Sequence, residues 1–202
     1  MTIPARLAAL AVFLISGLAL RAQFDVTYAV AGSGARTLWL MAGYFTILTN
    51  LLLAGHMAAV AMGWRIGASR AAGMLLSILV VGIVYHAVLA GLWAPQGMAW
   101  WADQGLHSAA PLGMLVWWWV FAPKGVGWRD LPTWLVWPLA YCGYALLRGA
   151  LTGFWPYPFL DAGVLGWPVV AAHVAGMVAG FAVLGTGIVA VARSVRQARL
   201  IQ

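Results

Sequence analysis

Long apolar runs separated by short polar connections constrain this chain more than any other feature of its sequence. The runs end near six positions: Leu20, Gly63, Trp93, Phe121, Gly149 and Ala192. A helix needs about 20 apolar residues to cross a bilayer, so six spans would use roughly 120 residues. The chain has 202 residues, of which 64% are hydrophobic. We therefore expect an all-α polytopic membrane protein, a six-transmembrane-helix bundle that forms one domain over residues 1–202.

The positions of the runs predict the spans, and the basic residues predict their orientation. The spans are expected at residues 6–24, 38–63, 71–93, 103–122, 131–150 and 167–192. A cytoplasmic amino terminus places most basic residues inside: Arg6, Arg65, Arg70, Lys124, Arg129, Arg193, Arg196 and Arg199. It places fewer outside: Arg21, Arg36 and Arg148. This bias follows the positive-inside rule and predicts that both termini are cytoplasmic.

The composition excludes several classes of protein. Charged residues make up 7% of the chain, against about 25% in an ordinary soluble domain. The single cysteine, Cys142, excludes a secreted scaffold held by disulfides. The net charge of +7 reflects the expected topology, so we expect no nucleic acid partner. Lys124 is the one lysine among eleven basic residues, which together with the short loops favours a multi-pass protein of a bacterial inner membrane.

Polar residues at membrane depth are the candidates for function, and the second expected span has most of them. Thr46, Thr49, Asn50 and His56 fall within about 120° of one another on a helical wheel. Polar groups at this depth usually face protein or water. This face either packs against other helices, with the threonine hydroxyls bonded to their own carbonyls, or it lines a site.

Three of the four histidines are expected in the outer halves of their spans, namely His86, His107 and His173. They share this level with further polar groups: Thr46, Thr49, Tyr85, Tyr144 and Arg148. The histidines lack the local spacing of a zinc site, and a haem would need His86 and His173 on facing helices. We expect no metal and no cofactor. A hydroxyl within about 3 Å of an imidazole can instead act as a nucleophile, which fits Thr46 or Thr49 with His107.

The connection over residues 151–167 is expected to form a lid on the outer side. Two prolines restrict its backbone, so we expect it to be ordered without regular structure. It carries Tyr157 and Asp161, and we expect Asp161 to lie near Arg148 or a histidine. Arg148 either extends toward the membrane surface or holds an anionic ligand group in a bidentate fork.

Three segments carry a resemblance to a known family. They are Tyr44–Asn50, which reads YFTILTN, Gly105–His107 with Pro111 after it, and Thr152–Asp161, which reads TGFWPYPFLD. These segments resemble the androgen-induced transmembrane protein family over about residues 38 to 170. Its animal members are threonine hydrolases that cleave fatty acid esters of hydroxy fatty acids, and its bacterial relatives share the six-span layout.

The resemblance implies that Thr46 is the nucleophile and His107 the histidine of the site, and Thr49 remains the second candidate nucleophile. We then expect a membrane-embedded lipid-ester hydrolase whose substrate is an acidic amphiphile, such as a fatty acid ester of a hydroxy fatty acid, supplied by the bilayer. Asn50 would donate to the oxyanion, a role worth about 3 kcal/mol where such donors have been removed. Arg148 would hold the acidic group of the substrate.

Other functions use the same residues differently. A small transporter would use the polar cluster as a binding site near the membrane midplane. A sensor or lipid-binding protein would hold the same ligand without turnover. Gly176 and Gly180 allow close helix contact either within the bundle or with a second protomer, so the sequence leaves the oligomeric state open.

Overall fold

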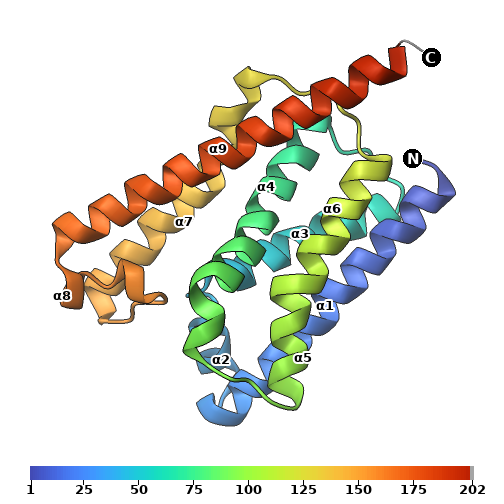
Figure 1. The fold of residues 1–202 in the computed structure, drawn as a ribbon. Coiled ribbons are helices and arrows are strands. Elements are labelled where there is room, and N and C mark those ends of the chain that lie inside the picture. The colour runs from blue at the N-terminus through green and yellow to red at the C-terminus, as the bar shows by residue number, and fades with distance from the viewer. Residues whose placement is uncertain (201–202) are drawn as a thin grey trace. The chain divides into compact units, whose positions relative to one another are not determined.

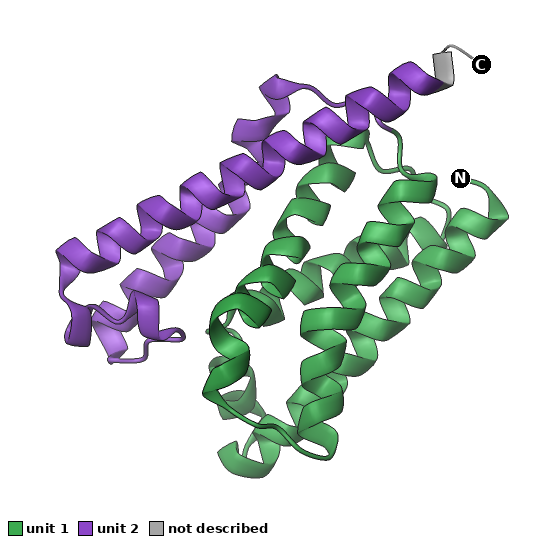
Figure 2. Ribbon diagram, in the orientation of Figure 1, with its two compact units in different colours: residues 1–123 green, residues 124–202 purple. Residues whose placement is uncertain are grey.

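The computed structural model describes residues 1–200, and this part of the chain contains helices and turns without β-strands (Figure 1). The chain divides into two compact units, Met1–Pro123 and Lys124–Gln202 (Figure 2). The expected all-α class agrees with these helices. The expectation of one domain over residues 1–202 stays a prediction.

The first unit contains six α-helices and three short helical turns. They are α1 (Ile3–Ala31), α2 (Gly34–Met41), α3 (Phe45–Ala61), α4 (Ala68–Val84), η1 (Tyr85–Leu89), η2 (Ala90–Leu92), α5 (Met98–Gln104), η3 (Gly105–Ala109) and α6 (Ala110–Phe121). The second unit contains the remaining elements: η4 (Trp128–Asp130), α7 (Leu131–Thr152), η5 (Pro158–Leu160), α8 (Ala162–Leu165) and α9 (Trp167–Leu200). The helical segments overlap the residues of the expected spans, and the number of six membrane spans stays a prediction.

Helix α1 packs against α3, α5 and α6 within the first unit. The Arg6 guanidinium donates through Nε to the carbonyl of Ala61, 2.9 Å away at the end of α3. The Trp117 indole of α6 donates to the carbonyl of Ala5 at 3.0 Å. Because a helix leaves its last carbonyls without partners inside the helix, the Arg6 contact also caps α3.

The second expected span, residues 38–63, is not one straight helix. Helices α2 and α3 meet at an angle of 97°. The last turn of α2 tightens, since the amides of Gly43 and Tyr44 bond three residues back to Leu40 and Met41. Tyr44 then adopts an extended conformation, with φ −102° and ψ 131°. Helix α3 therefore starts at Phe45, and the break places Thr46 in its first turn.

Among the described residues, three helices are long and apolar enough to cross a membrane: Ile3–Ala31, Ala68–Leu92 and Trp167–Ala198. The bent pair α2 and α3 makes a fourth if it is counted as one span. By length and composition, the chain is therefore a helical membrane protein.

The second unit is built on α7 and α9, which pack together. The loop between α7 and α8 folds back on α7, where the Trp155 ring lies over Gly149. A Cβ at Gly149 would come within 2.2 Å of that ring, so glycine is required at this close approach. His173 of α9 binds the carbonyl of Phe159 in the same loop through Nδ1 at 2.9 Å. The segment thus has defined contacts with both long helices of its unit.

Candidate active site

Thr46 and His107 meet inside the first unit. The Thr46 hydroxyl oxygen, Oγ1, lies 3.3 Å from Nε2 of the His107 ring. Thr46 comes from the first turn of α3, and His107 comes from η3. Thr46 is 8% exposed, and the His107 side chain is 14% exposed. The pair is therefore largely shielded from solvent.

Helical irregularities bring this pair together. His107 reaches the depth of Thr46 because its helical segment begins early, at Met98, and continues through η3 into α6. Both η1 and η3 are π-helical turns, which are rare and often occur at functional sites. Pro111 has no N–H to donate to the carbonyl of His107, which interrupts the regular pattern there. Gly82 lets that carbonyl approach α4, because a Cβ at this position would lie 3.0 Å from the oxygen.

The other ring nitrogen of His107 faces Asp103, one helical turn earlier. Nδ1 lies 3.1 Å from the Asp103 carbonyl oxygen and 3.2 Å from the carboxylate oxygen Oδ1. An Nδ1–H that donates to this carbonyl leaves Nε2 unprotonated and able to accept from Thr46. The geometry thus suits an imidazole that acts as a base toward the hydroxyl.

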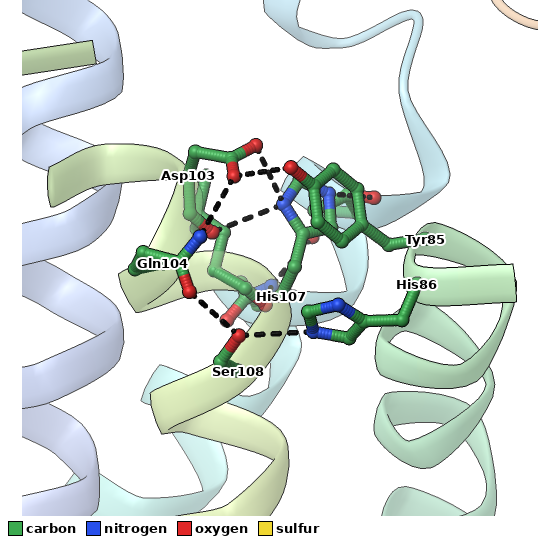
Figure 3. A network of polar contacts seen from close by, with 9 residues as sticks. Tyr85, His86, Asp103, Gln104, His107 and Ser108 are labelled. Carbon is green, nitrogen blue, oxygen red and sulfur yellow. Dashed lines mark hydrogen bonds and ion pairs between the residues drawn. The ribbon is translucent and has the colours of Figure 1, made fainter. Parts of the chain in front are cut away.

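Asp103 is 1% exposed and sits at the centre of a polar network (Figure 3). The Tyr85 hydroxyl donates to its Oδ2 at 2.5 Å, and Gln104 donates to the same oxygen at 3.4 Å. The Tyr85 ring also stacks on the His107 ring, with centroids 3.9 Å apart and planes at 15°. Tyr85 therefore supports both the carboxylate and the imidazole.

The network continues outward through the next residue of η3. Ser108 donates to the side-chain oxygen of Gln104 at 3.0 Å, and His86 Nε2 lies 3.0 Å from the Ser108 hydroxyl. His86 is exposed, unlike His107. This second histidine is therefore an outer member of the network and contacts Ser108 rather than Thr46.

Asn50 holds the two halves of the site together. Its amide nitrogen, Nδ2, donates to the Thr46 carbonyl at 2.9 Å and to the Leu106 carbonyl at 3.2 Å. Both amide protons are therefore used on main-chain oxygens. In this arrangement Asn50 fixes α3 against η3, which differs from the expected donation to an oxyanion.

Thr49 and His56 are the other two residues of the expected polar face. Thr49 is fully buried, but the imidazole bond of His107 falls on Thr46. His56 lies further along α3, where its Nδ1 contacts the carbonyl of Leu52 at 2.8 Å. Thr46 is therefore the residue of this expected face whose hydroxyl meets the His107 imidazole.

The remaining predicted site residues belong to the second unit. Arg148 is 4% exposed; it donates to the Tyr144 hydroxyl at 3.0 Å and lies 4.5 Å from the centroid of the Phe154 ring. Tyr157 stacks on Phe159 within the loop. Asp161 caps α8, since its carboxylate accepts from the amide of Val164 at 3.1 Å. His173 supports the loop through Phe159, as described above.

The sequence reasoning missed Asp103, Gln104 and Ser108. A signal for Asp103 was present, because it is one of only four acidic residues in the chain. It also stands four residues before His107, which places the two side chains on one helix face. An acidic residue at that spacing from a candidate base is a reason to include it in the site.

No group of three or more His, Cys, Asp or Glu side chains that could hold a metal occurs in the part of the chain that the structure describes. Comparisons with family models, with curated proteins and with solved structures found no match.

Proposed function

We propose that this protein is a membrane-embedded lipid-ester hydrolase in which Thr46 is the nucleophile and His107 the general base. The observation that carries the proposal is the distance of 3.3 Å between Thr46 Oγ1 and His107 Nε2. A nucleophile and its base must approach to hydrogen-bond distance, with somewhat looser geometry before substrate binds. The chemical types and the separation both fit nucleophilic acyl transfer.

The reaction proceeds in two halves. His107 Nε2 takes the proton of Thr46 Oγ1 as this oxygen attacks the ester carbonyl carbon. The tetrahedral intermediate then breaks its bond to the alcohol oxygen, which receives the proton from Nε2, and the acyl group stays on Thr46. In the second half, Nε2 deprotonates a water that attacks the acyl carbon. The acid leaves as the proton returns to Thr46 Oγ1.

The start of α3 supplies an oxyanion donor in this proposal. Amide N–H groups in the first turn of a helix have no acceptor within the helix, and they lie at the positive end of the helix dipole. Ile47, the residue after Thr46, lies in this turn, and its main-chain amide is the donor that we propose. Amides that point at the developing negative charge contribute about 3 kcal/mol where one such donor has been removed. This role passes from Asn50, whose amide protons are used elsewhere, to the main chain of α3.

The substrate class follows from the family resemblance and from the membrane setting. We propose a fatty-acyl ester that enters from the bilayer, and in particular a fatty acid ester of a hydroxy fatty acid. The proposed setting is a bacterial inner membrane, with six spans and both termini cytoplasmic. The role of Arg148 in holding an acidic group of the substrate stays a prediction.

The proposed topology predicts which positions react with an impermeant thiol reagent in intact cells. Cysteines at Gln96 and Val164, both exposed, should be labelled from outside, and a cysteine at Gly125 should not, because the positive-inside rule places it in the cytoplasm. Gln96 is used rather than Gly97, whose φ of 57° strains any other residue. All variants carry Cys142→Ser. Labelling of the cysteine at position 125 alone would show that the orientation is the reverse of the predicted one.

The hydrolase proposal is tested with a fluorophosphonate probe on the purified full-length protein. The probe should modify Thr46, identified by mass spectrometry of the labelled peptide, because an activated hydroxyl attacks phosphorus as it attacks a carbonyl carbon. Thr46→Ala should lose the label, and the matched variant Thr49→Ala should keep it. Reversible binding without a covalent adduct would favour a lipid-binding, sensor or transport protein instead.

A further inference from the structure

The buried carboxylate of Asp103 can accept more hydrogen bonds than its contacts in the structure supply. Its Oδ2 accepts from Tyr85 and Gln104. Its Oδ1, within the described part of the chain, accepts no hydrogen bond and lies 3.2 Å from His107 Nδ1. Burial of an acceptor without a partner costs free energy. An open oxygen at this position is therefore placed to interact with a change of charge on His107.

We infer that Asp103 is a positioning residue for His107 and completes a Thr46–His107–Asp103 chain. The inference rests on the proposed function. When Nε2 takes the Thr46 proton, the imidazole becomes a cation, and the carboxylate 3.2 Å from Nδ1 then forms an ion pair with it. This attraction is absent in the resting state and present in the transition state, so it accelerates the chemical step. The proton itself stays on the imidazole, as in other triads of this type.

Tyr85 gives the carboxylate its orientation. Its hydroxyl fixes Oδ2 at 2.5 Å, which leaves Oδ1 directed to His107 (Figure 3). Its ring stacks on the imidazole and restricts the tilt of that ring. Tyr85 comes from η1 and Asp103 from the end of α5, so two separate helical segments support one imidazole.

A purely structural role for Asp103 is the competing explanation. In that case the carboxylate would only join η1 to α5 through Tyr85. Removal of the carboxylate would then destabilise the fold and lower kcat both in the wild-type background and in a variant that lacks His107. A positioning role acts through His107 alone, and this difference decides the experiment.

The test is Asp103→Asn in the full-length protein, which keeps the shape of the side chain and removes its charge. We expect kcat for a fatty-acyl ester to fall about 10³–10⁴-fold, with KM nearly unchanged because Asp103 is buried. In a His107→Gln background, Asp103→Asn should cause no further loss of kcat, because the effects of substitutions at residues that act as a unit are not additive. Asp25→Asn, at an exposed ion pair with Arg21, is the matched control and should leave kcat unchanged.

Two further measurements keep the inference separate from the proposed function. Tyr85→Phe keeps the ring stack but removes the bond to Oδ2, and kcat should fall about tenfold. In proton NMR at a pH that protonates the ring, the wild-type Nδ1–H of His107 should give a far-downfield signal that Asp103→Asn removes. Wild-type kcat in Asp103→Asn, an additive loss in the double variant, or absence of this signal in the wild type would each overturn the inference. Wild-type turnover that persists in Thr46→Ala would instead contradict the proposed function.

Discussion

Replacement of Thr46 by alanine should abolish ester hydrolysis and leave the protein folded. The change removes the oxygen that forms the covalent bond to the acyl group in the proposed mechanism, and loss of the nucleophile in hydrolases with a hydroxyl nucleophile lowers kcat by roughly 10⁴-fold or more. The loss of one partly shielded hydroxyl and methyl group costs about 1 kcal/mol of unfolding free energy. Steady-state hydrolysis of a fatty-acyl ester and a thermal unfolding curve measure the two effects.

Two neighbouring changes give this experiment its controls. Thr46→Ser keeps a hydroxyl at the same position and should retain measurable turnover. Thr49→Ala removes a hydroxyl that is also buried and lies one turn further along α3, and its kcat should stay within a few-fold of the wild type. If Thr49→Ala loses activity while Thr46→Ala keeps it, Thr49 is the nucleophile and the assignment made here is wrong.

The starts of the two long helices of the second unit could be predicted from the apolar runs in the sequence. The fifth span was expected at residues 131–150, and α7 covers Leu131–Thr152. The sixth was expected at 167–192, and α9 covers Trp167–Leu200, so its start agrees and its end lies beyond the expected one. The apolar run therefore locates where such a helix starts, whereas α9 continues through the more polar residues after its apolar run.

The break between α2 and α3 could not be predicted in the same way. The residues from Ala42 to Tyr44 contain no proline and are no more polar than their neighbours. A straight helix from Leu38 would place Thr46 about 12 Å along its axis, which made the approach of His107 uncertain from sequence. In the structure, α3 starts at Phe45 rather than at residue 38, and the helical segment that carries His107 starts at Met98 rather than at residue 103. Both starts depend on how the helices pack against one another, which the local sequence does not specify.

The candidate site was likewise only partly predictable. The residue types Thr46 and His107 pointed to nucleophilic chemistry, and the helical wheel placed Asn50 on the same face as Thr46. Hydrogen-bond partners depend on which helix lies opposite, and the wheel carries no information on that. The amide of Asn50 therefore donates to the carbonyl of Leu106, a contact between residues far apart in the chain.

Replacement of His107 by glutamine is the second change with a large expected effect. Glutamine can still hydrogen-bond the Thr46 hydroxyl, but it cannot take up a proton in the reaction. A positioned general base contributes about 10²–10⁴-fold to a rate, so kcat should fall by at least about 10³-fold, with KM close to the wild-type value. Labelling of Thr46 by the fluorophosphonate should slow in parallel, because the same proton transfer activates the hydroxyl.

The matched control is His86→Gln in the same network. His86 contacts Ser108, the residue after His107, and does so from η1 rather than η3. If proximity to the polar network were sufficient for catalysis, the two histidine variants would lose similar activity. The proposal requires a large difference, since only His107 has one nitrogen on Thr46 and the other beside Asp103. Equal kcat values in the two variants, or wild-type turnover in His107→Gln, would contradict a catalytic role for His107. The contact between Thr46 and His107 would then serve helix packing alone.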